Sequence, residues 1–218
     1  MSDPRNAVIY RIHDAALEQA VRRYGGGRLI DIGCGKKPYK ALLQRHIKEH
    51  VGVDRAGGLH GMDAVDLVGT AYEIPAPDAS FDTAMCTAVL EHLEEPSEAL
   101  AECFRVLKSD GYAIYSVPFI WHLHEEPRDF YRYSKYGLRY LFEKAGFEVV
   151  ELKALSGFWV TFGTLFLYNL YRFNRGPIRR WHALDPMGRA LGEVAHGLDR
   201  LDRTEQWTWM YLVVARKP

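Results

Sequence analysis

The stretch RLIDIGCGKKPYK, residues 28–40, combines a strand pattern with a turn suited to a ligand. Its apolar start, which contains Asp31, is typical of a strand buried in a parallel sheet. Gly33 and Gly35 lack side chains, so the backbone can turn sharply and approach a ligand closely. Pro38 suits the first turn of a helix, whose free N–H groups favour an anionic group. The stretch predicts a strand, a turn and a helix that bind a nucleotide-like ligand carrying a carboxylate or phosphate.

Short apolar runs alternate with helical patterns over the rest of the chain. Strand patterns occupy residues 28–32, 50–54, 62–69, 81–89, 111–118, 147–155 and 207–217. Helical patterns occupy residues 38–47, 96–108 and 134–146 between them. Strands that alternate with helices form right-handed crossovers and a parallel sheet. We therefore expect an α/β fold, a Rossmann-like seven-stranded and mostly parallel sheet with helices on both faces and a helical insertion between strands six and seven.

The same pattern divides the chain into four parts. An amphipathic helix occupies residues 1–27, where apolar residues recur at helical spacing until a run of glycines ends the helix. The core fills residues 28–155, a helical insertion fills residues 156–206, and the last core strand fills residues 207–218. These boundaries predict one core domain with one elaboration.

The insertion begins with the aromatic and aliphatic run GFWVTFGTLFLYNLY, residues 157–171. The run is shorter than the ~18 apolar residues that a helix needs to cross a bilayer. We expect a buried lid helix that caps the acceptor. Two alternatives stay open, namely peripheral membrane contact through residues 156–180, where arginines would meet lipid headgroups, and burial of the run in a homodimer.

Composition narrows the class of protein. The chain of 218 residues carries 28 basic and 28 acidic residues, and this balance argues against a nucleic-acid partner. Its three cysteines are widely spaced and form no CxxC pair, which argues against disulfides and structural zinc and fits a reducing compartment. The first residues carry charges throughout and do not look like a signal peptide, so we expect a cytoplasmic location.

An acid at the end of the second strand extends the predicted ligand site. Asp54 follows Gly35 by 19 positions, and an acid there accepts hydrogen bonds from ribose hydroxyls. The same combination fits a dinucleotide site, which makes an NAD(P)-linked oxidoreductase the alternative. The dinucleotide pattern G-x-G-x-x-G requires a third glycine where Pro38 stands, however.

Five segments give a specific resemblance when they are taken in order. They are LIDIGCG (29–35), VGVD (51–54), TAYEIPAPDASFDTAMCTAVLEHL (70–93), EALAECFRVLKSDGYAIYSVP (98–118) and YGLRYLFEKAGFEVVEL (136–152). In order and spacing the chain resembles the class I S-adenosylmethionine-dependent methyltransferases, and within them the methyltransferase type 11 group. The resemblance implies the fold expected above, an enzyme, and S-adenosyl-L-methionine as the cofactor.

The resemblance also implies which residues contact the cofactor. They are Asp31, Gly33, Cys34, Gly35, Asp54, Arg55, Thr70, Ala71, Tyr72, Thr87 and Ala88. In the family the turn around Gly33 contacts the methionine portion and the acid at Asp54 holds the ribose. Thr70 stands where an acid usually takes the adenine amino group, and its hydroxyl could accept the same bond. Lys37 stands where a further glycine is frequent.

Methyl transfer to an alcohol or amine also requires a route for a proton. Candidate bases should follow strands four and five, and there the sequence has His92, His122 and His124. Some similar methyltransferases hold a divalent ion through Glu-x-x-Glu-His and a later histidine. Here Ala88 replaces the first Glu. His122-x-His124 could compensate together with Glu91 and His92, but we expect no metal.

The function that these patterns predict is methyl transfer from S-adenosylmethionine to a small or medium acceptor. Oxygen is the favoured atom, and the acceptor is expected to be a sugar, a ring-bearing compound or a lipid-linked compound. A small-molecule acceptor is the expected partner. Besides the oxidoreductase, a non-catalytic protein that binds the cofactor and a protein partner stays an alternative.

Overall fold

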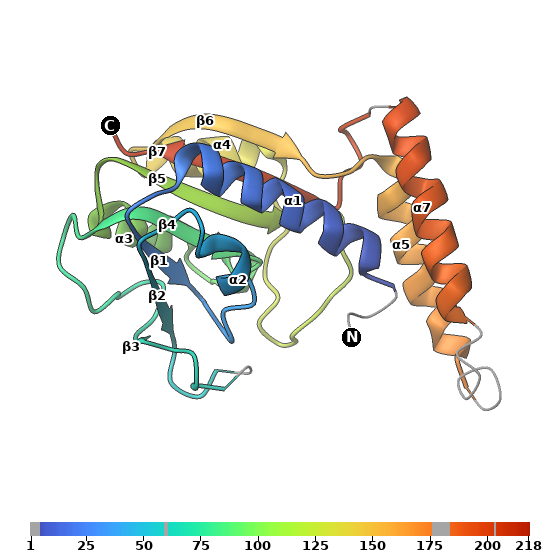
Figure 1. Ribbon diagram of the computed structural model, residues 1–218, viewed down its shortest axis with the longest axis horizontal. Coiled ribbons are helices and arrows are strands. Elements are labelled where there is room, and N and C mark those ends of the chain that lie inside the picture. Colours follow the sequence, from blue (N-terminus) through green and yellow to red (C-terminus); the bar gives the residue numbers. More distant parts are fainter. Residues whose placement is uncertain (1–4, 59–60, 176–183, 203) are drawn as a thin grey trace. The chain divides into compact units, whose positions relative to one another are not determined.

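The computed structural model describes residues 5–58, 61–175, 184–202 and 204–218. A seven-stranded sheet with the order β3-β2-β1-β4-β5-β7-β6 forms its centre (Figure 1). The strands are β1 (Arg28–Ile32), β2 (Glu49–Asp54), β3 (Leu67–Val68), β4 (Phe81–Thr87), β5 (Leu107–Pro118), β6 (Glu148–Ala154) and β7 (Met210–Arg216). All seven predicted strands are present.

The sheet is mostly parallel, as predicted. β1 pairs in parallel with β2 on one side and with β4 on the other, so Asp31 lies between Gly52 and Met85. β2–β3 and β4–β5 are also parallel pairs. β7 runs antiparallel to β5, because Lys217 bonds to the Asp110–Gly111 end of β5 while Trp209 bonds to Phe119 at its other end. The strand order reverses between β1 and β4, where open α/β sheets bind their ligands.

Helices cover both faces of the sheet (Figure 1). They are α1 (Ala7–Tyr24), α2 (Lys40–Leu43), α3 (Pro96–Val106) and α4 (Lys135–Lys144). Two further helices, α5 (Phe158–Leu170) and α7 (Leu184–Asp202), lie in the insertion. Tyr24 of α1 packs on Tyr112 with ring centroids 5.4 Å apart, and Phe142 of α4 packs on Tyr115 at 5.2 Å. Tyr112 and Tyr115 are an odd number of positions apart on β5, so their side chains point to opposite faces.

Helix α2 is shorter than the predicted helix over residues 38–47. The N–H groups of Lys48 and Glu49 both donate to the Gly27 carbonyl, which draws the chain directly back to the start of β2. Because the chain returns to β2 so soon, α2 has only about one helical turn, in which Leu43 is buried. Helix α4 begins with a side-chain cap, because the Ser134 side chain accepts from the Gly137 N–H.

The chain forms two compact units. The larger contains residues 17–118, 123–153 and 211–218 and carries most of the sheet, whereas the smaller contains the residues up to 16, 119–122 and 154–210. The structure thus groups the first half of α1 and a short loop with the insertion, a grouping that the sequence pattern does not reveal. The four-part division stays a prediction.

The smaller unit contains the helical pair α5 and α7. The Asp199 carboxylate of α7 accepts from the N–H groups of Gly157, Trp159 and Val160, and so satisfies the first turn of α5. On α5 the side chains of Phe158 and Trp159 are exposed, among other aromatic residues, while Val160, Thr161, Thr164 and Leu167 are buried. In the part of the chain that the structure describes, no helix has the length and apolar character to cross a membrane.

Candidate active site

A cavity of about 520 Å³ lies in the larger unit, where β1, β2 and β4 end. All of the residues predicted to contact the cofactor, from Asp31 to Ala88, line this one cavity. They come from three strand ends and from the loop after β3, which are far apart in the sequence and meet only because parallel strands end at one edge. The volume is within the range typical of small-molecule sites.

The turn after β1 requires glycine at its first position. Gly33 has a φ of +72°, and a Cβ added there would lie 2.5 Å from Cγ2 of Val89. Its N–H donates to the Val53 carbonyl at 2.9 Å, which ties the turn to β2. The bare backbone of the turn therefore forms part of the cavity wall.

Asp54 connects the ends of β1 and β2. Its Oδ2 accepts from the Gly35 N–H at 2.9 Å and its Oδ1 from the Arg55 N–H at 2.8 Å. Each carboxylate oxygen can accept more than one hydrogen bond, so both still offer acceptor capacity to a ligand's hydroxyl groups. The carboxylate is thus fixed in position at the cavity wall.

Lys37 does not line the cavity. Its ammonium group pairs with Asp66 and donates to the His50 carbonyl at 3.1 Å, which anchors the turn to the loop before β3. Its φ of +50° is in the left-handed region that favours glycine. This conformation explains physically why glycine is frequent at the position. Of the three lysines in the opening stretch, only Lys36 lines the cavity.

Asp31 is buried beneath the turn. His50 Nε2 lies 2.9 Å from Oδ2 of Asp31, and burial raises the pKa of this carboxyl group while His50 opposes the rise. The contact holds the carboxylate in an orientation set by β2. Asp31 therefore contributes a fixed polar group to the floor of the cavity.

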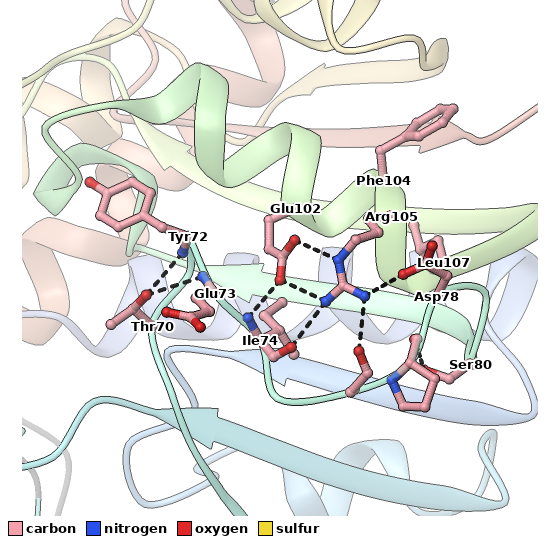
Figure 2. Close-up of polar contacts among 12 residues, drawn as sticks. Thr70, Tyr72, Glu73, Ile74, Asp78, Ser80, Glu102, Phe104, Arg105 and Leu107 are labelled. Atoms are coloured by element: carbon pink, nitrogen blue, oxygen red, sulfur yellow. Dashed lines mark hydrogen bonds and ion pairs between the residues drawn. The ribbon is translucent and has the colours of Figure 1, made fainter.

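Thr70 forms a turn with the residues that follow it. Its Oγ1 accepts from the N–H groups of Tyr72 and Glu73, each at 3.2 Å (Figure 2). Because these bonds occupy both lone pairs, the hydroxyl is left chiefly as a donor. This geometry weighs against the predicted role of Thr70 as acceptor for an adenine amino group, and that role stays a prediction.

An arginine of α3 braces the loop that carries this turn, and the sequence analysis missed it. Arg105 donates to the Glu102 carboxylate, to Asp78 and to the carbonyls of Ile74 and Ala76 (Figure 2). Glu102 in turn accepts from the Ile74 N–H at 2.6 Å. The i,i+3 spacing of a Glu and an Arg on a helix is a signal for a pair, but nothing in it indicates the loop partners.

His92, Glu125 and Arg128 also line the cavity. His92 closes a short 3-10 turn, η1 (Leu90–His92), that follows β4. Its Nδ1 lies 2.5 Å from the Arg128 carbonyl oxygen, and its ring meets the His124 ring edge-on with centroids 4.8 Å apart. Two of the three predicted bases are therefore neighbours.

Glu91 is fully buried beside these two histidines. Burial raises the pKa of its carboxyl group to about 8. Among the described residues, neither carboxylate oxygen has a hydrogen-bond partner. Its backbone carbonyl accepts from the N–H groups of Phe130 and Tyr131, which fixes the loop after β5 against η1. The predicted site does not include Glu91, because its burial depends on how this loop folds.

The third predicted base, His122, belongs to the smaller unit. Its ring contacts Tyr168 and Trp121 with centroids 4.5 Å and 4.9 Å away. The assignment of His92, His122 and His124 as bases stays a prediction.

Comparison with known proteins agrees with this arrangement. Residues 30–115 match the methyltransferase domain family, and they include the ends of β1, β2 and β4. Over these residues the chain is similar to S-adenosylmethionine-dependent methyltransferases, and solved methyltransferases share its fold. The predicted resemblance to the type 11 group is confirmed. This methyltransferase core is similar to a probable S-adenosylmethionine-dependent methyltransferase of Mycolicibacterium smegmatis, with 30% identity over 115 residues that cover 50% of the chain and 45% of the relative.

Two further similarities bear on the methyltransferase core. A ubiquinone biosynthesis O-methyltransferase of Paracidovorax citrulli is 30% identical over 106 residues, covering 42% of the chain and 43% of the relative. The chain thus spans less than half the length of these curated relatives. A solved S-adenosylmethionine-dependent methyltransferase from Thermotoga maritima, described as a possible histamine N-methyltransferase, matches with a TM-score of 0.62 at 21% identity, covering 98% of this chain and 93% of that one, and shows the fold.

The residues of the cavity fit S-adenosylmethionine, the cofactor of this family. The backbone turn at Gly33, where a Cβ would overlap Val89, and the buried Asp31 both line the cavity. Asp54 stands at the end of β2 with acceptor capacity for ribose hydroxyls. Thr87 and Ala88 end β4 on the wall of the same cavity, where Ala88 has a φ of +52°. Backbone strain of this kind persists mostly at functional sites.

Proposed function

We propose that the chain transfers a methyl group from S-adenosylmethionine to an oxygen atom of a small or medium ring-bearing acceptor. The observation that carries the proposal is the convergence of every predicted cofactor-contact residue on one cavity at the switch point of the sheet. When bound, the cofactor supplies a methyl group on a positively charged sulfur. The acceptor oxygen forms a bond to the methyl carbon as the carbon–sulfur bond breaks, which leaves a neutral thioether, and the acceptor loses one proton.

The residues of the chain bind and orient the cofactor in this proposal. The backbone from Gly33 to Gly35 lies against the methionine portion, and Asp54 accepts from the ribose hydroxyls. Arg55, at the next position along the chain, lies against the adenine. Because Asp54 is already fixed by two N–H groups, the site needs little reorganisation to bind its ligand.

The acceptor occupies the end of the cavity lined by His92, Glu125 and Arg128. This end combines the imidazole ring of His92, the carboxylate of Glu125 and the guanidinium of Arg128. The combination suits a planar acceptor with a hydroxyl group. The name of the Paracidovorax relative, a ubiquinone biosynthesis O-methyltransferase, supports oxygen as the atom and a ring in the acceptor. The role of the insertion as a lid stays a prediction.

Calorimetric titration with S-adenosylmethionine and S-adenosylhomocysteine tests the proposal. We expect one molecule bound per chain, and loss of measurable binding in Asp54→Ala. Asp110→Ala is the matched control, because Asp110 pairs with Arg216 at an exposed site that does not line the cavity. Failure of both ligands to bind, or equal binding by Asp54→Ala, would overturn the proposal. Binding of NADH in their place would favour the oxidoreductase.

A further inference from the structure

A cluster of metal-binding side chains lies next to the cavity in the larger unit. Oε1 of Glu91 is 3.9 Å from Nε2 of His92 and 3.8 Å from Nε2 of His124. One ligand atom from each of the three residues lies within 4.8 Å of the others. These distances are too long for direct hydrogen bonds, so the three groups face a common point without bonding to one another.

Glu91 gives an independent reason to expect a ligand at this point. Its side chain is completely buried, and within the described ranges neither of its oxygens accepts a hydrogen bond. Burial of a carboxylate without compensation is strongly unfavourable, so native proteins pair such a group or use it to coordinate a metal. The aim of Oε1 between two imidazole nitrogens matches the second arrangement.

The surroundings orient both imidazole rings toward Glu91. His92 Nδ1 lies against the Arg128 carbonyl oxygen, which can only accept, so Nδ1 carries the hydrogen and Nε2 offers a lone pair. His124 is held on its Nδ1 side by Asp129, at 3.3 Å, and Arg132, at 3.4 Å, which leaves Nε2 facing Glu91. Metal-binding histidines are commonly held in this way, by a carbonyl or a carboxylate on the other ring nitrogen.

We propose that Glu91, His92 and His124 bind one divalent transition-metal ion, of the Zn²⁺ type, at the wall of the cavity. Two imidazoles and one carboxylate are a common ligand set for such ions. Metal–ligand bonds of about 2.0–2.1 Å place tetrahedral ligand atoms about 3.4 Å apart. The two distances to Glu91 need to shorten by a few tenths of an ångström, which side-chain rotation provides.

This site goes beyond the proposed function, because methyl transfer does not itself require a metal. Three protein ligands leave a coordination position open. His92 lines the acceptor end of the cavity, so an acceptor hydroxyl that enters there is within reach of the ion. A divalent ion lowers the pKa of an oxygen that it binds and so favours loss of the proton. In this arrangement His92 and His124 act as ligands rather than as bases.

The sequence pattern offered Glu91, His92 and a histidine of the His122-x-His124 pair only as an alternative, and we expected no metal. Ala88 removes one carboxylate of the pattern known from similar methyltransferases, and His124 is distant from Glu91 in the sequence. The loop after β5 brings His124 into place because Glu91 accepts backbone hydrogen bonds from it. Only the folded loop completes the set.

Titration of the metal-free full chain with Zn²⁺ by calorimetry, and with Co²⁺ by visible absorption, tests the proposal without cofactor or acceptor. We expect one ion per chain and a Co²⁺ spectrum typical of low coordination number. Glu91→Gln and His124→Gln should each weaken metal binding more than tenfold. Tenfold is the smallest loss that is typical when a residue beside a metal ligand is replaced, and these two residues are themselves ligands. His46→Gln is the matched control, because His46 is a partly buried histidine of the same unit that belongs to no such cluster among the described residues.

A second variant separates metal binding from folding. Glu91→Met fills a similar volume without a buried carboxylate, so its metal-free melting temperature should be at or above that of the wild type, while the rise caused by Zn²⁺ disappears. Absence of stoichiometric binding by the wild type would overturn the proposal. So would equal binding by Glu91→Gln, which would indicate surface coordination only. Because these measurements contain no S-adenosylmethionine, their failure would leave the proposed methyl transfer intact.

Discussion

The missing side chain of Gly33 determines how closely a ligand can approach the backbone at this position. We predict that Gly33→Ala weakens binding of S-adenosylhomocysteine more than tenfold and destabilises the protein. The left-handed backbone costs alanine about 1–2 kcal/mol, and the contact with Val89 adds to this cost. Calorimetry and thermal unfolding measure the two effects.

Gly57→Ala is a close control for that variant. Gly57 has a φ of +71°, almost the same as Gly33, yet in the described part of the chain no heavy atom beyond its neighbours lies within 4 Å of an added Cβ. It should therefore show the backbone cost alone. If both variants lose the same stability and bind ligand equally well, close packing at Gly33 has no role.

Thr70 allows a test in which affinity is gained. An aspartate at this position can accept the N–H groups of Tyr72 and Glu73 and still offer lone pairs, which the threonine does not. We predict that Thr70→Asp binds S-adenosylmethionine about threefold to tenfold more tightly, as one added hydrogen bond would give. Unchanged or weaker affinity in calorimetry would mean that the adenine amino group does not meet this residue.

At the residue scale, the sequence predicted contacts that depend on strand ends and missed those that depend on loops. Gly33, Asp54 and their partners follow short strands, so their meeting at one edge could be inferred from the order of the strands. The positions of Glu91 and Arg105 depend on hydrogen bonds to loops whose paths have no periodic signal.

At the scale of elements, α5 depends on a cap that comes from another helix. We predict that Asp199→Ala lowers the free energy of unfolding by about 1–2 kcal/mol, because three N–H groups of the first turn lose their acceptor. Hydrogen exchange at Gly157, Trp159 and Val160 should accelerate with it. Asp199→Asn keeps one acceptor oxygen, so its exchange rates and its free energy of unfolding should lie between those of the wild type and of Asp199→Ala. Unaltered exchange in Asp199→Ala would contradict the prediction.

Element boundaries follow the sequence most closely where burial is continuous. β1 begins and ends as its apolar run predicts, because both of its faces are covered. α2 ends early because the return to β2 is fixed by hydrogen bonds to Gly27 rather than by its own residues. Helical propensity over residues 38–47 could not reveal this tertiary constraint.

At the scale of the whole molecule, a ligand that binds the larger unit stabilises that unit by mass action. At a concentration one hundred times its dissociation constant, S-adenosylhomocysteine adds about 2.7 kcal/mol. We predict that the unfolding transition of the sheet, followed by circular dichroism, moves upward by several degrees. Asp54→Ala should show no shift, and a shift of equal size in that variant would contradict the assignment.

Tryptophan fluorescence offers a separate view of the smaller unit. The tryptophans of the described residues, at positions 121, 159, 207 and 209, fall within its ranges, and Trp181 lies outside the described residues. The sequence shows where they are, but the grouping of residues 119–122 with the insertion depends on long-range contacts that no local pattern carries. Comparison of the two signals on one sample reports whether ligand binding in one unit stabilises the other.

The carboxylate of Asp54 has a kinetic consequence. Its two oxygens accept hydrogen bonds from the N–H groups of Gly35 and Arg55 before any ligand binds. The cavity wall at Asp54 is therefore already in its ligand-binding conformation. Capture of the cofactor should then proceed in a single exponential phase whose rate rises linearly with concentration and shows no plateau from a slow rearrangement of the turn.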